Sequence, residues 1–297
     1  MGLHETILVT GAGGLVGKAI CKRLHSAKLP FIALYRNDHL MHETEEKVLY
    51  ADLENDDLEV VFGKEEFSCI IHCAAAIPGD KYSFDECNRI NTGIDRKIAD
   101  LAIKKKVSKL IFISTTNLYG STEKKLTEET RVNIENPYSS AKLSSESLFL
   151  SLKNIETVIL RINAPYHFSQ KNNTVLKIFI EKGLKGEDLV YHGSGSRQQD
   201  FTHVEDIASA VICSLRSSRS GIYNIASGSP VSMKDLAKLI ISKLPGTKSI
   251  VHASGQADAQ EHHKALFDIS KAGSDLNWHP KISLSEGIDE WIKNKKQ

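Results

Sequence analysis

Hydrophobic residues in the first half of the chain form short continuous runs, separated by longer stretches with helical spacing. The runs cover residues 6–10, 31–35, 48–53, 69–75, 110–115 and 157–162. Stretches at 16–27, about 90–105 and 137–152 repeat apolar residues every three or four positions. Strands that are apolar throughout and alternate with helices are typical of a parallel sheet buried on both faces. The pattern therefore predicts an α/β fold with a Rossmann-type, doubly wound parallel sheet.

The pattern changes after residue 165. It predicts helices at about 174–183, 204–215, 232–243 and 284–293, with short strands at 189–191 and 221–226. We predict a dinucleotide-binding Rossmann domain over 1–165, to which residues 200–227 return, and a smaller C-terminal α/β substrate-binding lobe over 166–297. Because no repeat or low-complexity linker separates these parts, we expect the lobe to pack on the first domain.

The composition is that of an ordinary globular protein and excludes several classes of partner. The 297 residues are 41% hydrophobic and 25% charged, with a net charge of +1. A nearly neutral chain lacks the electrostatic footprint of a nucleic-acid-binding protein. No apolar run approaches the roughly 20 residues of a membrane span, and no signal peptide is recognisable, so we expect a cytoplasmic protein. The five cysteines form no C-x-x-C pair, which favours reduced thiols, and we expect no metal site.

A glycine-rich stretch, TGAGGLVG at 10–17, follows the first strand and opens the first helix. Gly11 suits a tight turn, Gly14 lets a pyrophosphate approach the backbone, and Gly17 lets the helix pack close to the sheet. The N–H groups of the first helical turn, which includes Leu15 and Val16, then face the phosphates. At this position in the chain, the stretch predicts a nucleotide cofactor.

The segment NPYSSAKLSSE at 136–146 places Tyr138 and Lys142 four residues apart, on one face of the helix that Pro137 begins. Taken alone, this pair is most simply a surface pair. Together, G-x-x-G-x-x-G and Y-x-x-x-K resemble the short-chain dehydrogenase/reductase superfamily, and the length and further motifs resemble its extended branch, the NAD-dependent epimerase/dehydratase family. The resemblance covers nearly the whole chain.

The resemblance implies the catalytic group. Tyr138 would exchange a proton with the substrate oxygen as hydride moves to or from the nicotinamide. Lys142 would lower the phenol's pKa from about 10 and hold the nicotinamide ribose. In FISTTNLYG at 112–120, Thr115 would orient the substrate oxygen, with Ser114 as the alternative. Family dehydratases carry an Asp-Glu pair at the next two positions, where this chain has Thr116 and Asn117. Epimerisation and keto reduction are therefore favoured over dehydration.

The resemblance also implies the cofactor contacts. The second strand ends in Tyr35 and Arg36, where an acidic residue would bind the ribose of NAD. An arginine can pair with a 2′-phosphate, so we expect NADP over NAD, the alternative being that Arg36 stacks on the adenine. The other residues that the resemblance assigns to the cofactor are Asp52, Leu53, Cys73, Ala74, Ala75, Asn91 and Pro165.

The substrate side departs from the family. Ala164 stands where nucleotide-sugar enzymes usually have asparagine, and Gln199 stands where a phosphate-binding arginine is usual. Arg197 is the candidate substitute, and SGQADAQEHH lacks the usual Arg-Pro-Gly-Asp clamp. We expect substrate contacts from Thr116, Asn163, Tyr166, Arg197 and Gln199.

These features predict an NAD(P)-dependent oxidoreductase acting at a sugar carbinol or ketone. A nucleotide-sugar 4-epimerase or a 4-keto-sugar reductase is the leading form. The alternatives are an NADP-dependent reductase of a non-nucleotide carbonyl substrate, favoured by the altered phosphate contacts, and a non-catalytic cofactor-binding scaffold. By resemblance we expect a homodimer that pairs through two helices of each subunit.

Overall fold

A parallel sheet forms the centre of the molecule. The computed structural model describes residues 6–36, 47–79 and 81–295. Within these residues the main sheet has seven strands, all parallel, in the order β11-β6-β5-β4-β1-β2-β3. In that order the strands are β11 (Gly221–Ile225), β6 (Glu156–Ile162), β5 (Lys109–Thr115), β4 (Cys69–His72), β1 (Ile7–Thr10), β2 (Phe31–Tyr35) and β3 (Lys47–Tyr50). The strand order reverses between β1 and β4, where doubly wound folds bind ligands beyond the carboxyl ends of the strands.

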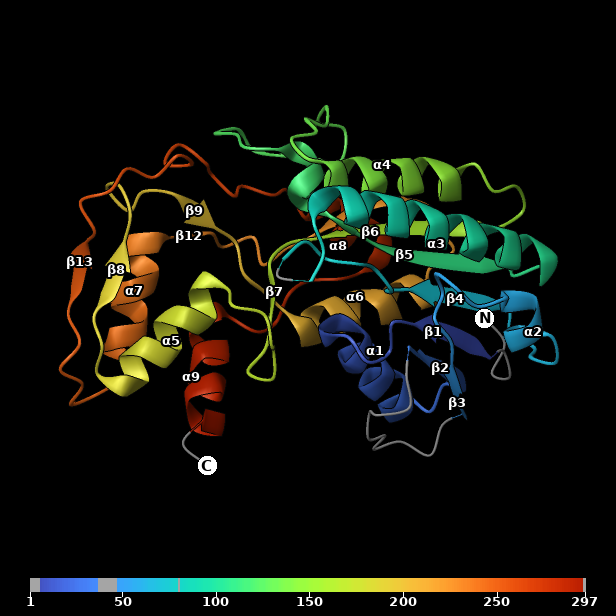
Figure 1. Ribbon diagram of the computed structural model, residues 1–297, viewed down its shortest axis with the longest axis horizontal. Coiled ribbons are helices and arrows are strands. Elements are labelled where there is room, and N and C mark those ends of the chain that lie inside the picture. Colours follow the sequence, from blue (N-terminus) through green and yellow to red (C-terminus); the bar gives the residue numbers. More distant parts are fainter. Residues whose placement is uncertain (1–5, 37–46, 80, 296–297) are drawn as a thin grey trace.

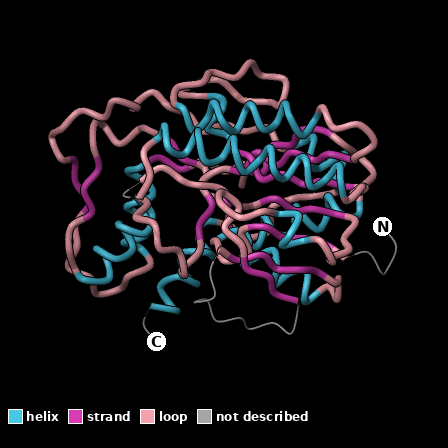
Figure 2. The backbone as a smooth tube through the Cα atoms, turned by 45° about the vertical axis from the view of Figure 1, so that its right-hand side comes forward, coloured by secondary structure: helices cyan, strands magenta, loops and turns pink. Residues whose placement is uncertain are grey.

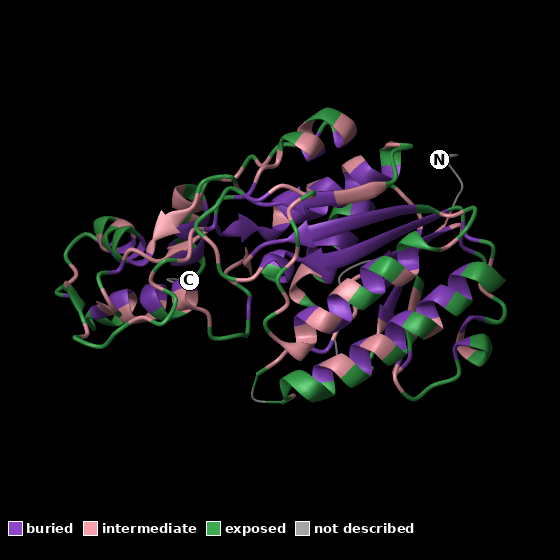
Figure 3. Ribbon diagram, turned by 90° about the horizontal axis from the view of Figure 1, so that it is seen from above, coloured by how far each residue is buried: buried purple, intermediate pink, exposed green. Residues whose placement is uncertain are grey.

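Helices cover both faces of the sheet (Figure 1). One face carries α1 (Leu15–Ser26), α6 (Val204–Arg216) and α8 (Ser270–Leu276); the other carries α2 (Leu58–Phe62), α3 (Phe84–Lys104) and α4 (Pro137–Leu150). Along β1, Ile7 and Val9 pack into the first core and Leu8 into the second, as the alternation of a strand requires. The inner strands, such as β1 and β5, are therefore buried on both sides (Figure 3), whereas the edge strand β3 is partly exposed; the predicted Rossmann-type fold is confirmed.

The smaller lobe lies at one end of the sheet and is joined to it by several crossing segments (Figures 1 and 2). Its own core joins α5, α7 and α9. The remaining elements, including the short pairs between lobe and sheet, are the 3₁₀ helix η1 (Thr116–Tyr119), β7 (Pro165–Tyr166), α5 (Val175–Lys185), β8 (Leu189–Tyr191), β9 (Gln198–Gln199), β10 (Thr202–His203), β12 (Val231–Ser232), α7 (Met233–Ser242), β13 (Val251–Ala253) and α9 (Leu284–Lys295).

The chain crosses between the two parts more than once. Residues 200–227 contribute α6 and β11 to the sheet side, and α8 also packs there, with Ala272 and Leu276 in the core that α1 and α6 share. Among the described residues, no helix combines the length and the apolar character that crossing a membrane requires. The predicted domain limits stay a prediction.

Candidate active site

The glycine loop connects β1 to α1 in a turn that side chains would block. Gly11 has φ +67°, and a Cβ there would lie 2.7 Å from the backbone nitrogen of Ala74. A Cβ on Gly17 would lie 2.1 Å from the carbonyl oxygen of Gly11. Gly14 is the N-cap of α1 and is exposed. The inner side of the loop, at Gly11 and Gly17, is thus packed against backbone atoms. Its outer side, at Gly14, is accessible to a ligand.

The first turn of α1 offers free hydrogen-bond donors. No side chain caps this helix, and its first turn carries no acidic residue. Among the described residues, nothing accepts a hydrogen bond from the backbone N–H groups of Leu15, Val16 or Gly17. By contrast, Ser83 caps α3 and Asn136 caps α4. Uncapped N–H groups and the positive end of the helix dipole fit the pyrophosphate of a dinucleotide.

The carboxyl end of β4 forms a rim beside this loop. The Thr10 hydroxyl oxygen accepts from the N–H groups of Cys73 and Ala74, each at 3.3 Å, and both residues are partly exposed, as is Ala75. Asn91 lies behind the rim, 1% exposed, and its amide makes two hydrogen bonds to the backbone of Ala76. Asn91 therefore supports the rim from inside.

The expected adenosine contacts also gather at one edge. Tyr35 pairs with Tyr50 at the ends of β2 and β3. Arg36 donates to the Tyr82 hydroxyl oxygen at 3.0 Å, and its second terminal nitrogen lies 3.7 Å from an oxygen of Asp52. Leu53 is buried in the core at 6% exposure. The Arg36 guanidinium is therefore already engaged by a phenol and a carboxylate.

The helix α4 presents the tyrosine–lysine pair. Asn136 caps it by accepting from the Ser139 N–H at 2.9 Å, and Pro137 occupies its first turn, so Tyr138 stands at the helix start. Lys142 is 3% exposed; its Nζ donates to the Ile113 carbonyl at 3.0 Å and lies 4.4 Å from the Phe112 ring centre. Among the described residues, no hydrogen bond acts on the Tyr138 hydroxyl, whose titratable neighbours are Cys87 and Asp95.

Burial shifts the pKa of both groups in opposite directions. It raises the pKa of the Tyr138 phenol well above its usual value, and Cys87 and Asp95 raise it further. Burial lowers the pKa of Lys142, while Asp95, Cys73 and Glu146 oppose that shift. Without a bound ligand, the phenol is therefore protonated at neutral pH and able to donate a proton.

Thr115 and Ser114 occupy different places at the end of β5. Ser114 is buried and donates to a carboxylate oxygen of Glu146 at 2.5 Å. Thr115 is the last residue of β5, 9% exposed, and its hydroxyl oxygen accepts from the Asn117 N–H at 3.1 Å as the cap of η1. Thr115 therefore lies at the carboxyl end of β5 with its hydroxyl oxygen at the start of η1, whereas the Ser114 hydroxyl is bound to Glu146 inside the fold.

The expected substrate residues are spread over two environments. Thr116 donates to the side-chain oxygen of Asn163 at 2.8 Å, and both are buried. Pro165 pairs with Thr202 between the two parts of the molecule. Tyr166 is 2% exposed in the lobe core, and its hydroxyl lies where a Cβ on Gly287 would be, which favours a packing role.

Arg197 is held by a segment whose residues the sequence analysis did not single out. Its Nε lies 3.2 Å from a carboxylate oxygen of Asp258, and its Nη1 donates to Gln260 at 3.1 Å. Gln199 lies in β9, partly exposed, and pairs with Val231. The segment at 254–263 therefore holds the Arg197 side chain through Asp258 and Gln260. The signal that could have found it was the acidic residue Asp258 near the expected clamp position.

His167, His203 and Glu290 form a cluster of possible metal ligands between α6 and α9. The Nδ1 of His203 accepts from the Glu205 N–H at 3.3 Å, so the ring proton is on Nε2, which lies 3.3 Å from a Glu290 oxygen. An Nε2 that carries a proton toward a carboxylate cannot bind a metal at the same time. His203 therefore caps α6 and directs its Nε2 toward Glu290.

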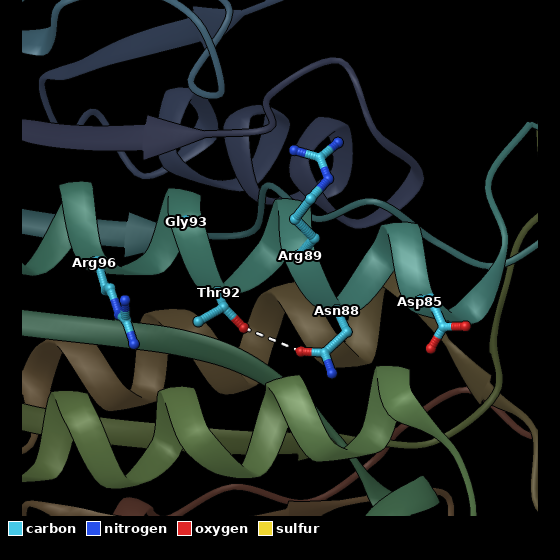
Figure 4. A pocket seen from close by; sticks show the side chains of 6 residues that line it. All are labelled: Asp85, Asn88, Arg89, Thr92, Gly93 and Arg96. Atoms are coloured by element: carbon cyan, nitrogen blue, oxygen red, sulfur yellow. Dashed lines mark hydrogen bonds between the residues drawn. The ribbon is translucent and has the colours of Figure 1, made fainter.

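A hollow on the outer side of α3 has none of the expected site residues. Asn88, Thr92 and Arg96 point to the side on which α4 runs, and the Thr92 hydroxyl donates to Asn88 at 3.2 Å (Figure 4). The residues that line it all belong to this one helix: Asp85, Asn88, Arg89, Thr92, Gly93 and Arg96. The hollow belongs to the outward face of the α3–α4 pair.

The glycine loop with its uncapped helix start and the tyrosine–lysine pair thus lie together beyond the carboxyl ends of the strands. This arrangement defines a Rossmann-type oxidoreductase of the short-chain dehydrogenase kind. The chain belongs to the NAD dependent epimerase/dehydratase family, whose model matches residues 7–226. The predicted family, and with it the prediction of an enzyme, are confirmed.

Relatives with known names agree with this family. A putative UDP-glucose 4-epimerase of Methanocaldococcus jannaschii is 28% identical over 97% of this chain and 98% of its own. The dTDP-4-dehydro-6-deoxyglucose reductase of Escherichia coli is 23% identical over 97% and 96%. The Thermus thermophilus UDP-glucose 4-epimerase, solved with NAD, superposes with a TM-score of 0.86 at 22% identity, covering 98% and 99%. The expected preference for NADP finds no support here, and NAD is consistent with the family.

Proposed function

We propose that this enzyme uses NAD to transfer hydride at a sugar carbinol and that its reaction is the 4-epimerisation of a nucleotide sugar. The observation that carries the proposal is that the uncapped start of α1 and the helix of Tyr138 and Lys142 lie at the same edge of the sheet. Thr116 and Asn117 replace the acid–base pair of the dehydratases, which leaves epimerisation and keto reduction. Keto reduction uses the same groups as epimerisation. Because the expected preference for NADP finds no support, epimerisation is favoured.

The chain's residues supply the proton chemistry and the positioning. NAD, when bound, accepts and returns a hydride. Lys142, fixed at the Ile113 carbonyl, would hold the nicotinamide ribose, and its positive charge together with that of the bound nicotinamide would favour the Tyr138 phenolate. As phenolate, Tyr138 would take the proton of the substrate hydroxyl while hydride leaves the same carbon. As phenol, it would return that proton to the carbonyl oxygen when the hydride comes back. Thr115 would orient that oxygen at the end of β5.

NAD suits the adenosine end better than NADP. Arg36 already donates to Tyr82, and the Asp52 carboxylate lies 3.7 Å from its guanidinium. A carboxylate at this place can accept a ribose hydroxyl and would repel a 2′-phosphate. We therefore propose NAD as the cofactor.

One observation favours a second candidate substrate. Arg197, the expected phosphate ligand, is already paired with Asp258 and Gln260, so a diphosphate must compete with these partners. A carbonyl compound without a diphosphate would not need to displace them. The test is incubation with NAD and a panel of UDP- and dTDP-sugars, with the C4 epimer detected by NMR and Tyr138→Phe as the control. Epimerisation of any nucleotide sugar supports the proposal; NAD(P)H-dependent reduction of simple ketones alone would replace it with the second candidate.

We also propose a weak homodimer and a cytoplasmic location. The adjacent helices α3 and α4 lie on one face of the sheet (Figure 1), but their outward side is rich in small and polar side chains, such as Thr92 and Ser144. Such a face adds little apolar area, so the dimer should dissociate on dilution. All five cysteines are described and none forms a disulfide, which suits a reducing compartment. Light scattering over a range of concentrations tests the dimer.

A further inference from the structure

A chain of buried polar side chains connects the cofactor rim to the catalytic helix. Thr10 at the end of β1 lies 2.6 Å from Nδ1 of His72 on β4, and Nε2 of His72 lies 2.7 Å from Asp95 on α3. The Ser145 hydroxyl on α4 donates to the other oxygen of Asp95. None of the four residues is more than 2% exposed. The chain links four elements that are far apart in the sequence.

The hydrogen bonds of this chain have a defined direction. The Thr10 hydroxyl oxygen accepts from the N–H groups of Cys73 and Ala74, so its proton is directed to His72. The His72 proton is then on Nε2 and donated to Asp95. Asp95 accepts at both oxygens, from His72 and from Ser145, as a carboxylate does. A buried carboxylate costs several kcal/mol unless hydrogen bonds and nearby charge compensate it.

Asp95 stands beside both members of the tyrosine–lysine pair. The charged or titratable groups near Lys142 are Asp95 from α3, Cys73 after β4 and Glu146 on α4 itself; near Tyr138 they are Cys87 and Asp95, both from α3. Arg161 neutralises Glu146, at 2.7 Å, and burial raises the pKa of both thiols, which keeps them uncharged. Among these groups, Asp95 is the negative charge with no cation of its own.

We propose that Asp95 is a positioning residue for the proposed reaction, with two effects. The first effect is mechanical. Asp95 binds Ser145, which lies on α4 three residues after Lys142, and so holds α4 against the rim after β4 that His72 and Thr10 support. Its charge also lies near Lys142, the residue proposed to hold the nicotinamide ribose, so it would stabilise the cationic, oxidised nicotinamide over the neutral, reduced one. This inference rests on the proposed function only in its choice of cofactor and reaction.

The decisive experiment measures cofactor binding without any substrate. In Asp95→Asn the amide oxygen still accepts from His72, and the amide nitrogen can donate to Ser145, whose hydroxyl lies 2.9 Å from the Ala141 carbonyl and can donate there. The shape is kept and the charge removed. We expect the ratio of the Kd of NADH to that of NAD to fall by roughly three- to tenfold. An unchanged ratio would overturn the proposed electrostatic effect.

Three further variants separate the two effects. Ser145→Ala keeps the charge and removes the link, so both Kd values should rise by similar factors while the ratio stays constant. Asp100→Asn, at an exposed position of the same helix, should change neither. If Asp95→Asn does not fold, Asp95→Thr removes the charge and leaves a hydroxyl that can accept from His72.

Turnover supplies the complementary readout. Removing a negative charge lowers the pKa of both Tyr138 and Lys142, so both limbs of the pH profile of kcat/KM should move down by about one pH unit in Asp95→Asn. Limbs that stay in place while turnover falls would contradict the proposal. If no nucleotide sugar is turned over but the NADH-to-NAD ratio shifts, the proposed reaction fails and the inference about Asp95 stands.

Discussion

The Nζ of Lys142 donates to the carbonyl oxygen of Ile113 at 3.0 Å, across the interface between α4 and β5. The same nitrogen lies over the Phe112 ring, 4.4 Å from its centre. This lysine is therefore held in place before any ligand arrives, by one hydrogen bond and one cation–π contact. Because Lys142 is fixed to the strand that ends in Thr115, the fold sets the relative position of these two proposed catalytic residues.

We expect Lys142→Arg to be nearly as damaging as Lys142→Met. A planar guanidinium does not fit where one ammonium donates to Ile113 over an aromatic ring. Both variants should raise the Kd of NAD severalfold and cut kcat by about 10²-fold or more, typical of a lost acid–base group. Calorimetric NAD titration and the epimerisation assay measure the two effects. Lys153→Met, at an exposed lysine after the same helix, is the control.

Tyr138→Phe should separate catalysis from folding. The hydroxyl has no hydrogen-bond partner among the described residues, so its removal should leave the Tm unchanged within about 2 °C. Turnover should fall by about 10²- to 10⁴-fold, with the Kd of NAD within a factor of two. Tyr191→Phe, at a partly exposed tyrosine of β8 in the smaller lobe, should leave activity unchanged. A Tyr138→Phe enzyme with normal turnover would remove the phenol from the mechanism.

Buried tyrosines should make the fold sensitive to alkali. Burial raises the pKa of Tyr223 to about 12 and that of Tyr138 and Tyr166 as well. When the pKa of a tyrosine is higher in the folded than in the unfolded state, its contribution to the free energy of unfolding is fully present below the unfolded pKa of about 10. That contribution is lost as the pH rises from the unfolded pKa through the folded pKa. Urea unfolding should show a falling midpoint from about pH 10 upward. Tyr166→Phe should reduce this dependence; an unchanged slope would show that Tyr166 does not contribute.

The sequence predicted the structure best for strands that are buried on both faces of the sheet. Continuous apolar runs located every strand of the main sheet, with differences only at ends such as β3, which stops at Tyr50. The glycine loop and the tyrosine–lysine spacing located the two halves of the site, because these positions depend on local backbone geometry. The two-residue strands β9 and β10 were not predicted, since periodicity is not defined over two residues.

Contacts between distant side chains could not be predicted. Nothing in the sequence links Asp95 to His72, 23 residues apart, or Arg197 to Gln260, 63 residues apart. Asn91 was assigned to the cofactor by motif, yet its amide faces the backbone of Ala76. Arg36 was expected to bind the 2′-phosphate of NADP because of its residue type and its place after the second strand. Its actual partners, Tyr82 and Asp52, lie on other segments of the chain, so the sequence did not show that Arg36 is already engaged.

The proposed preference for NAD rests on Tyr82 and Asp52, the two neighbours of Arg36, and can be measured directly. We expect NAD to bind at least tenfold more tightly than NADP, because the Asp52 carboxylate would repel a 2′-phosphate and its partner Arg36 is already engaged. Asp52→Asn should narrow this gap chiefly by improving NADP binding. Arg36→Ala should weaken both cofactors by similar factors, through lost packing on the adenosine. Fluorescence titration with NADH and NADPH, and calorimetric titration with NAD and NADP, measure these affinities for the unmodified enzyme and for both variants. Tighter binding of NADPH to the unmodified enzyme, abolished in Arg36→Ala, would instead restore the arginine as a 2′-phosphate ligand.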